Sequence, residues 1–365
     1  MEGRGIMQSW SNSEKKALVA TVLFVLAVLP FIQSINFGAI NFDDFPYTLN
    51  NPHVTRGIPL DGLRYAFFGT RELGIWFPLT LLSYQMDVTI AGASAQTFHI
   101  SSVIWHGLAT VALFFLIHAI LTARFGGQAT WHSLAISAVV ALWWGVHPQR
   151  VESVVWIASR KDLVSGLFAF LALNAYLHTR LNRSQENASA SFSVERGDFI
   201  TWGLYLLAIM GKPSVMTLPL AMGCAEWLAI GRVSWRKLVV PCVMSVCCAC
   251  LAVFMQTDAD TFAPGAERVA FWDRAVTSMA SIFYYLKTLV APGALSIFYP
   301  WPRQLEYGQA LLGLGIVGAW LFVGFVFLKH IGARKGSAWG DLAVTGLWYF
   351  GTLAPMLSLF MFGMH

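Results

Sequence analysis

The sequence predicts an all-α, polytopic membrane protein. Hydrophobic residues make up 56% of its 365 residues and charged residues 12%, whereas a soluble domain has about 25% charged residues. The apolar residues stand in continuous runs, which predict membrane-spanning helices and not the alternating strands of a β-barrel. The five cysteines show neither disulfide nor zinc-ligand spacing. These observations exclude a soluble enzyme, a disordered chain and a disulfide-stapled secreted module.

About nine apolar runs are long enough, or nearly long enough, to span a bilayer. Lys15 and Lys16 precede the first run, as in a signal peptide, but no small-residue cleavage site follows, so we expect an uncleaved helix. Residues 1–16 are then an N-terminal tail, and residues 17–365 form one transmembrane domain. The predicted spans lie near residues 17–35, 98–121, 132–147, 162–179, 199–212, 214–230, 238–256, 308–328 and 342–363.

The distribution of charge predicts which side of the membrane each loop occupies. Lys and Arg are denser in the segments on the side of the N-terminus, which predicts that this side is cytoplasmic. The long first outer loop then covers about residues 36–97. In segment 267–290, apolar residues recur every three or four positions, which predicts an amphipathic helix in the outer interface. Its polar face is predicted to carry Arg274, Thr277, Ser278 and Ser281.

The first outer loop begins with two adjacent acids, Asp43 and Asp44. Two neighbouring carboxylates can raise one pKa or bind a cation, and a carboxylate there can serve as a general base. The alternative is a solvated loop or a helix N-cap. The predicted outer side otherwise carries no metal-ligand spacing, and no metal site is expected.

A second polar element links the third and fourth spans, from His147 to Asp162. Arg150, Arg160 and Lys161 stand on the outer side against the usual bias, as expected if they bind a phosphate in the headgroup layer. Alternatively, these cations pair with Glu152 and Asp162 or with lipid headgroups. The net charge of +5 is scattered along the chain, so no nucleic-acid partner is expected.

Lys212 occupies the tight outer turn between the fifth and sixth spans. Its ammonium either extends along the helix to the interface or reaches the same anion as Arg160. These two interpretations remain open at the level of sequence.

A series of motifs occurs along residues 17–305 in a recognisable order: Phe42-Asp43-Asp44, Asn51-Pro52-His53-Val54, Trp76-Phe77-Pro78-Leu79-Thr80, His147-Pro148 through Arg160-Lys161-Asp162, Lys212-Pro213 with Thr217-Leu218-Pro219, and Phe298-Tyr299-Pro300. Together they resemble the membrane half of the transmembrane and tetratricopeptide-repeat O-mannosyltransferases and their bacterial relatives. This resemblance implies a GT-C glycosyltransferase fold. It also implies a polyprenyl-phosphate-linked sugar as donor, a protein or glycan hydroxyl as acceptor, and chemistry on the outer or luminal face.

The resemblance also assigns roles to residues. Asp43 and Asp44 match the catalytic acid pair of the family, with Asp43 expected to deprotonate the acceptor in an inverting transfer. Asp44 would orient the acceptor or hold an optional divalent cation, and no cofactor is expected to be obligatory. The cations expected to stabilise the leaving phosphate are Arg160, Lys161 and Lys212, helped by His147 or Arg150 and supported by Glu152 and Asp162.

Two alternatives to a transferase remain open: a flippase or transporter of lipid-linked sugars, and a non-catalytic subunit that binds them. A flippase should carry charges at mid-membrane depth, whereas the charges here gather at helix ends. The sequence shows no tetratricopeptide repeat, and on that ground the bacterial inner membrane is expected in preference to the endoplasmic reticulum.

Overall fold

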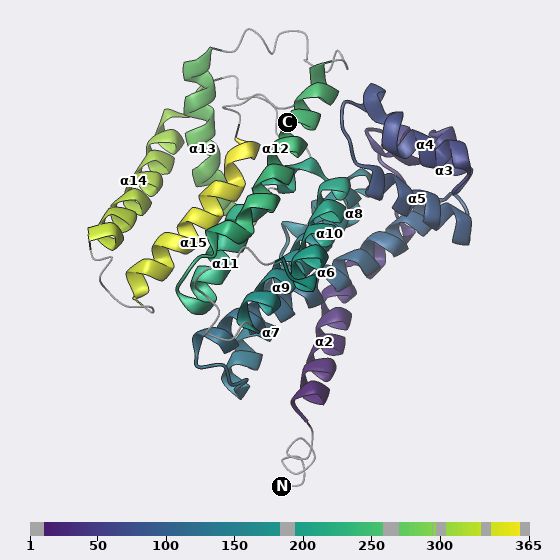
Figure 1. The fold of residues 1–365 in the computed structure, drawn as a ribbon. Coiled ribbons are helices and arrows are strands. Elements are labelled where there is room, and N and C mark those ends of the chain that lie inside the picture. The colour runs from purple at the N-terminus through teal and green to yellow at the C-terminus, as the bar shows by residue number, and fades with distance from the viewer. Residues whose placement is uncertain are drawn as a thin grey trace. The chain divides into compact units, whose positions relative to one another are not determined.

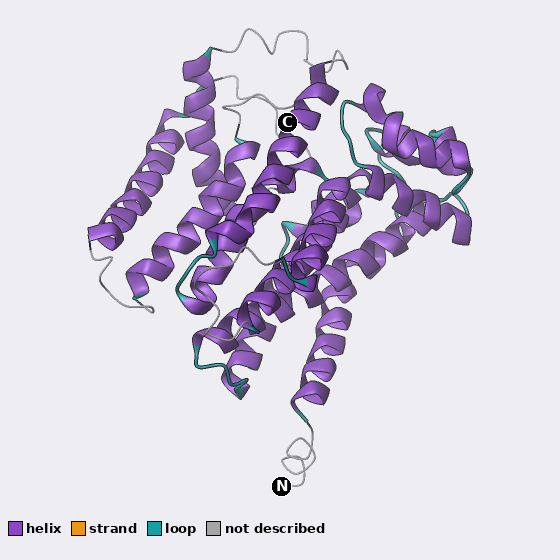
Figure 2. Ribbon diagram, viewed as in Figure 1, coloured by secondary structure: helices purple, strands orange, loops and turns teal. Residues whose placement is uncertain are grey.

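The computed structural model describes residues 11–182, 194–257, 270–293, 295–296, 304–329 and 337–357. Within these ranges the regular structure is entirely helical, joined by short loops (Figure 2). The chain divides into two compact units, which are described separately. The prediction of an all-α protein is therefore confirmed.

The first unit comprises residues 1–66 and 77–212. At its centre α6 packs against α2, α7 and α9, and α9 packs against α10 (Figure 1). The helices that lie in this unit are α2 (Asn12–Val28), η1 (Leu29–Asn36), η2 (Phe45–Leu49), α3 (Pro52–Thr55), most of α4 (Leu60–Phe68), α5 (Pro78–Ala91), α6 (Ala95–Arg124), α7 (Trp131–Val146), α8 (Arg150–Val155), η4 (Ile157–Ser159), α9 (Arg160–Leu181) and α10 (Arg196–Gly211).

The second unit comprises residues 67–76 and 213–365. Its helices pack side by side in the order α12, α11, α15, α14 and α13. They are η3 (Thr70–Leu73), η6 (Pro213–Thr217), α11 (Leu218–Ile230), α12 (Trp235–Thr257), α13 (Phe271–Val290), α14 (Tyr307–Lys329), α15 (Ala338–Leu353) and η8 (Ala354–Met356).

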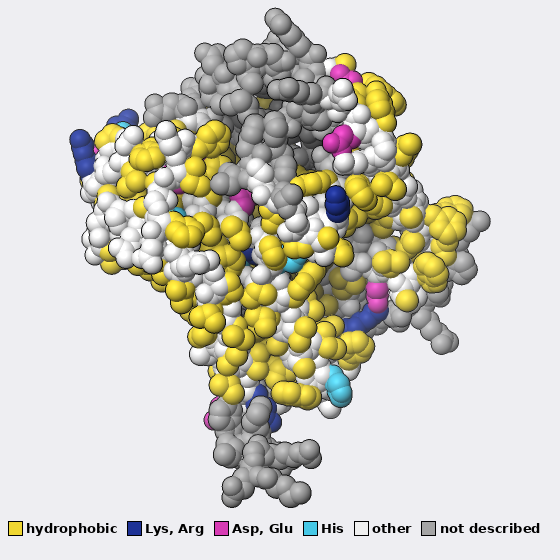
Figure 3. All heavy atoms as spheres, turned by 180° about the vertical axis from the view of Figure 1, so that it is seen from behind, with side chains coloured by type: hydrophobic (Ala, Val, Ile, Leu, Met, Phe, Trp, Pro, Cys, Tyr) yellow, Lys and Arg dark blue, Asp and Glu magenta, His cyan; other side chains and the backbone are white. Residues whose placement is uncertain are grey.

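All nine predicted spans fold as helices in the described ranges, and five helical stretches are long and apolar enough to cross a membrane. In the last of these only 6% of the most apolar window is buried, so its apolar side chains are suited to lipid contact. Hydrophobic side chains likewise predominate on the face drawn in Figure 3. The five stretches are Asn12–Asn36, Ala95–Arg124, Pro213–Ile230, Trp235–Met255 and Tyr307–Phe327, and the apolar helix Trp131–Val146 is shorter.

Local sequence signals explain where several helices begin and end. Ser11 caps α2 in a capping box, in which its hydroxyl accepts from the Glu14 backbone N–H and the Glu14 carboxylate accepts from the Ser11 backbone. This arrangement satisfies two backbone donors at the helix start. Gly231 ends α11 in the left-handed conformation, at φ 72°, which glycine adopts without steric cost.

The predicted first outer loop, residues 36–97, is mostly helical. It contains α3, α4 and α5, and α5 begins with Pro78, a residue suited to the first turn of a helix. Seven of the fourteen residues of α5 are buried. The segment is therefore a packed part of the structure, which positions the acids at its start.

The amphipathic helix predicted at 267–290 is α13, whose described part begins at Phe271. Ser278 was predicted on the polar face of this helix, but it is fully buried together with Val276 and Ile282. The buried face of α13 therefore differs from the prediction. The close approach of α14 explains the burial: a Cβ placed on Gly313 would overlap the backbone of Met279. The glycine at position 313 permits this contact, because it has no side chain.

Candidate functional site

The buried carboxylate of Asp44 connects two segments of the first unit by hydrogen bonds. Its side chain is 1% exposed, and its two carboxylate oxygens accept from the backbone N–H groups of Ile40 and Ala158, each at 2.8 Å. Burial raises the pKa of Asp44, while both backbone hydrogen bonds oppose that rise. Asp44 therefore fastens the chain after η1 to the turn that precedes α9.

Asp43 is placed differently from its neighbour. Its side chain is half-buried, and in the described part of the chain its carboxylate makes no hydrogen bond or ion pair. Its charge acts on Lys161 and on the hydroxyl of Tyr47. A carboxylate that is near a cation but not engaged by it is free to accept a proton from a substrate.

Lys161 lies in the first turn of α9 with its side chain half-buried. Its Nζ is 5.1 Å from the ring centroid of Tyr47, a cation–π distance. Across the ranges that the structure describes, this ammonium has no ion-pair partner, although Asp43, Asp162 and Glu152 act on it electrostatically. Lys161 is thus a partly desolvated cation with hydrogen-bonding capacity to spare.

Lys212 directly follows α10 and donates from its Nζ to Asp162 Oδ1 at 2.6 Å. Gly211 makes this pair possible, because a Cβ at that position would lie 2.8 Å from the backbone nitrogen of Ser165 in α9. The pair keeps part of its solvent exposure, at 23% for Lys212 and 34% for Asp162. Lys212 therefore belongs to the same cluster as Lys161, with one acidic partner.

The segment between α7 and α9 adds Arg150, which is half-buried over the Trp144 ring at 5.2 Å. Within the described ranges its buried Nε has no hydrogen-bond partner, and Asp162 and Glu152 act on its charge. Glu152 itself is exposed. His147 is 7% exposed, and its Nδ1 accepts from the Gln149 backbone at 3.3 Å. His147 therefore stabilises the turn.

Arg160 lies away from the cluster, in the protein interior. Its side chain is 0% exposed. Its Nη1 donates to Asp87 at 2.5 Å, its Nη2 to the Phe98 carbonyl at 2.6 Å and its Nε to Ser102 at 3.2 Å. The guanidinium also packs over the Tyr84 ring, 4.3 Å from its centroid. In this arrangement Arg160 joins α9 to α5 and α6, and its donors are directed at protein groups.

Several residues of the sequence motifs act as anchors around the cluster. Thr80 donates to the carbonyl of Gly211 at 2.9 Å, and Tyr84 donates to that of Ile157 at 2.6 Å. Gln85 donates to the carbonyl of His53 at 3.0 Å. These bonds tie α5 to the segments that carry Asp43, Lys161 and Lys212. The motif Phe298-Tyr299-Pro300 lies outside the described residues.

Sequence analysis alone missed three residues of this region: Asp87, Tyr47 and Trp156. The charge of Asp87 within an apolar stretch was a usable signal, because a buried acid needs a partner. Trp156 packs against Phe42 at 6.0 Å between ring centroids, and its buried indole N–H has no hydrogen-bond partner among the residues that the structure describes. An indole donor that packs against the residue preceding Asp43 in sequence is suited to bind a polar, ring-shaped ligand.

The first unit thus brings three cations, Lys161, Lys212 and Arg150, together with the carboxylates of Asp43, Asp162 and Glu152. Such a cluster can bind a phosphate and accept a proton close to it. In the described residues no group of His, Cys, Asp or Glu has metal-binding geometry.

The comparisons with known proteins bear on this arrangement. The "Protein O-mannosyl-transferase Tmtc1" of Drosophila melanogaster is 31% identical over 215 residues, covering 57% of this chain and 22% of that protein. The mouse protein O-mannosyl-transferase TMTC1 is 28% identical over 149 residues, or 38% and 14%. Human TMTC3 is 23% identical over 150 residues, or 40% and 15%.

The chain spans less than a quarter of the length of the curated relatives it matches. No family model matches the chain, and no solved structure matches it. These relatives come from fly, mouse and human, which does not favour the predicted bacterial inner membrane. The resemblance to the O-mannosyltransferases is confirmed: this polytopic membrane chain is similar to the protein O-mannosyl-transferases Tmtc1 and TMTC3.

Proposed function

We propose that this chain transfers a sugar, mannose by analogy with its relatives, from a polyprenyl-phosphate donor to a protein hydroxyl. The observation that carries the proposal is that a half-buried carboxylate, Asp43, acts electrostatically on the ammonium of Lys161 while making no ion pair with it in the described part of the chain. A transferase of this kind needs both a base for the acceptor and a cation for the leaving phosphate. The GT-C class and the outer or luminal location are part of the proposal.

The reaction we propose is a single displacement with inversion. The acceptor oxygen attacks C1 of the sugar while its proton passes to the Asp43 carboxylate. The bond between C1 and the phosphate oxygen breaks, and its electron pair leaves with the lipid phosphate. Lys161, Lys212 and Arg150 stabilise the charge that this phosphate gains.

In this proposal Asp44 is a positioning residue. Both of its oxygens already accept backbone hydrogen bonds, so a divalent cation there would compete with two amides for the same carboxylate. We therefore keep the proposal that no metal is obligatory. Asp44 acts by fixing the chain on which Asp43 stands.

The test is transfer of labelled mannose from polyprenyl-phosphate mannose to protein in membranes that contain the chain. Asp43→Asn keeps the size of the side chain and removes the base, so transfer should fall at least about 100-fold, the usual lower range for general-base catalysis. Asp61→Asn is the matched control, because Asp61 is an exposed acid on α4. This control should retain wild-type transfer.

The alternatives to a transferase give different results. A non-catalytic subunit binds the donor without transferring label, in the wild type and in both variants. Full transfer by Asp43→Asn would show that the base lies elsewhere.

A further inference from the structure

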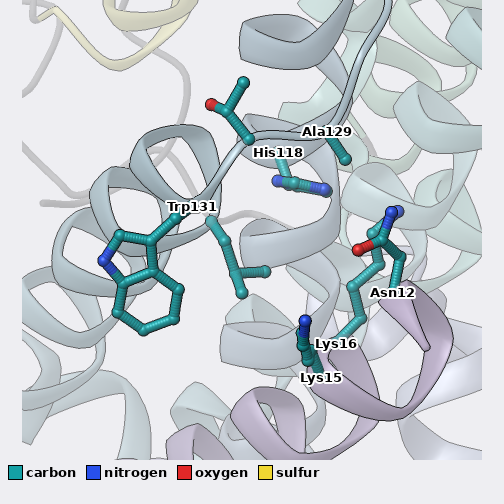
Figure 4. Close-up of a pocket in the computed structure, with 8 residues that line it drawn as sticks. Asn12, Lys15, Lys16, His118, Ala129 and Trp131 are labelled. Carbon is teal, nitrogen blue, oxygen red and sulfur yellow. The ribbon is translucent and has the colours of Figure 1, made fainter. Parts of the chain in front are cut away.

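A second polar site lies in the first unit, at the end that carries the start of α2. It is a pocket of about 180 Å³ between α2, α6 and the beginning of α7 (Figure 4). A water molecule occupies about 30 Å³ of liquid, so the pocket can hold a small polar group. Its lining consists of Asn12, Lys15, Lys16, His118, Ala129, Thr130, Trp131 and Leu134.

This pocket is far from the candidate active site. His99, which acts electrostatically on Asp44, and His118 both lie on α6. Nineteen residues of helix separate them, which is about 28 Å at 1.5 Å per residue. That distance is close to the thickness of the hydrocarbon core of a bilayer, so the two sites lie near opposite surfaces of a membrane.

The charge of the lining is entirely positive. Lys15 and Lys16 both contribute, and neither has an ion-pair partner in the part of the chain that the structure describes. The neighbouring acid, Glu14, is held by Ser11, whose backbone and hydroxyl donate to it at 2.7 and 2.8 Å. The N-terminal ends of α2 and α7 also line the pocket, and their dipoles favour an anion.

His118 is the independent indication of a ligand. Its side chain is 4% exposed, and the Ser133 backbone is a weak hydrogen-bond partner for one ring nitrogen at most, so within the described residues at least one ring nitrogen has no partner. The ring stacks on Phe114 at 5.9 Å and lines the pocket. A buried polar group without a partner is costly, and a ligand oxygen in the pocket would supply the missing partner.

We propose that this pocket binds a phosphate group, held by Lys15, Lys16 and His118. Its position favours the headgroup of an anionic phospholipid, because Trp131 is 61% exposed at the pocket rim and tryptophan gathers at membrane interfaces. Lysines next to a membrane attract anionic lipid as well. Soluble phosphate shares the chemistry, and the experiment distinguishes the two sources.

The experiment measures thermal unfolding of the purified chain in phosphatidylcholine micelles. Phosphatidic acid or inorganic phosphate is added at constant ionic strength. Phosphatidic acid should raise the unfolding temperature of the wild type by several degrees, and native mass spectrometry should show it retained. If inorganic phosphate gives the same rise at millimolar concentration, the site binds phosphate from solution.

Two variants test the residues. Lys15→Gln with Lys16→Gln changes only partly exposed side chains, and His118→Phe preserves a ring against Phe114. Each should reduce the shift to less than a third of the wild-type value. Lys237→Gln, at the start of α12 and outside the pocket lining, is the matched control and should keep the full shift.

Equal shifts in the lysine double variant and the wild type would overturn the proposal. The proposal would also be overturned if neither phosphatidic acid nor inorganic phosphate raised the unfolding temperature of the wild type above its value in phosphatidylcholine alone. If His118→Phe fails to fold, the double variant alone decides the outcome.

Discussion

Replacing Arg160 with methionine should destabilise the folded chain and leave donor binding by the folded fraction unchanged. The guanidinium is fully buried and supplies the ion pair to Asp87 as well as bonds to Ser102 and the Phe98 carbonyl. Methionine would leave the Asp87 carboxylate buried without a cation. Removing one partner of a buried pair costs about 3–5 kcal/mol.

A double variant sharpens the test. Asp87→Leu alone should cost about as much as Arg160→Met, because it leaves the guanidinium buried and unpaired. The combination removes both charges, and an apolar replacement of a buried ion pair is often close to neutral. The double variant should therefore recover most of the lost stability. Lys161→Met, next in sequence but half-buried and without an ion pair among the described residues, should change stability by about 0.5 kcal/mol or less.

The assay is unfolding in detergent micelles, followed by tryptophan fluorescence as temperature or denaturing detergent increases. Donor KM is measured on the same preparations. The reasoning is refuted if Arg160→Met unfolds like the wild type and instead raises the donor KM. That result would mean that Arg160 reaches the phosphate during turnover.

Three further expectations concern packing, pH and charge. Gly211→Ala should lower the unfolding temperature, because its Cβ would lie 2.8 Å from backbone of α9, whereas Gly203→Ala, with nothing within 4 Å, should be neutral or slightly stabilising. Burial raises the pKa of Asp44 above the ordinary value of 3.8 for an aspartate, so its stabilising contribution is complete below that pH and is lost as pH rises through the folded-state pKa. The stability of the wild type relative to Asp44→Asn should accordingly fall over that interval, in unfolding curves recorded against pH; a flat difference would contradict the shift. Asp162→Asn should lower the donor KM by up to about fivefold, because the pair with Lys212 is partly exposed and worth about 1 kcal/mol or less; an unchanged or higher KM would remove Lys212 from the phosphate site.

The helical composition of the fold followed directly from the sequence, because apolar runs of membrane-spanning length have few alternatives to a helix. The segment between the first two long helices did not, since its helices are short and mix polar with apolar residues. Asp87 and Gln85 are buried in α5. The hydropathy of this segment alone predicts a loop, because polar residues interrupt its apolar ones. The burial of the two polar residues depends on partners in other segments, Arg160 and the carbonyls of His53 and Gly62, and no local pattern reveals these partners.

The sequence also does not distinguish the two neighbouring acids of the candidate site. Asp43 and Asp44 are equivalent in composition and charge, and the sequence marks both as candidates. The structure separates them by backbone geometry, because Asp44 meets the N–H of Ala158, 114 positions away in sequence. A contact at that separation comes from packing of the whole unit, so the division between an anchoring acid and a free one is a property of the fold.

The adjacent cations Arg160 and Lys161 are separated for a reason that is local. They occupy consecutive positions at the start of α9, and consecutive residues of an α-helix project about 100° apart. α9 packs against α6 and α10, so one direction points into the interior, toward Asp87, and the next points past Tyr47 toward Asp43. The fully buried position favours arginine, because its planar group with five donors can satisfy several acceptors at once. The half-buried position suits lysine, whose compact charge can meet an incoming phosphate. The first of the two cations therefore stabilises the fold, and the second remains available to the proposed site. Arg160→Met should lower the unfolding temperature, whereas Lys161→Met should slow sugar transfer.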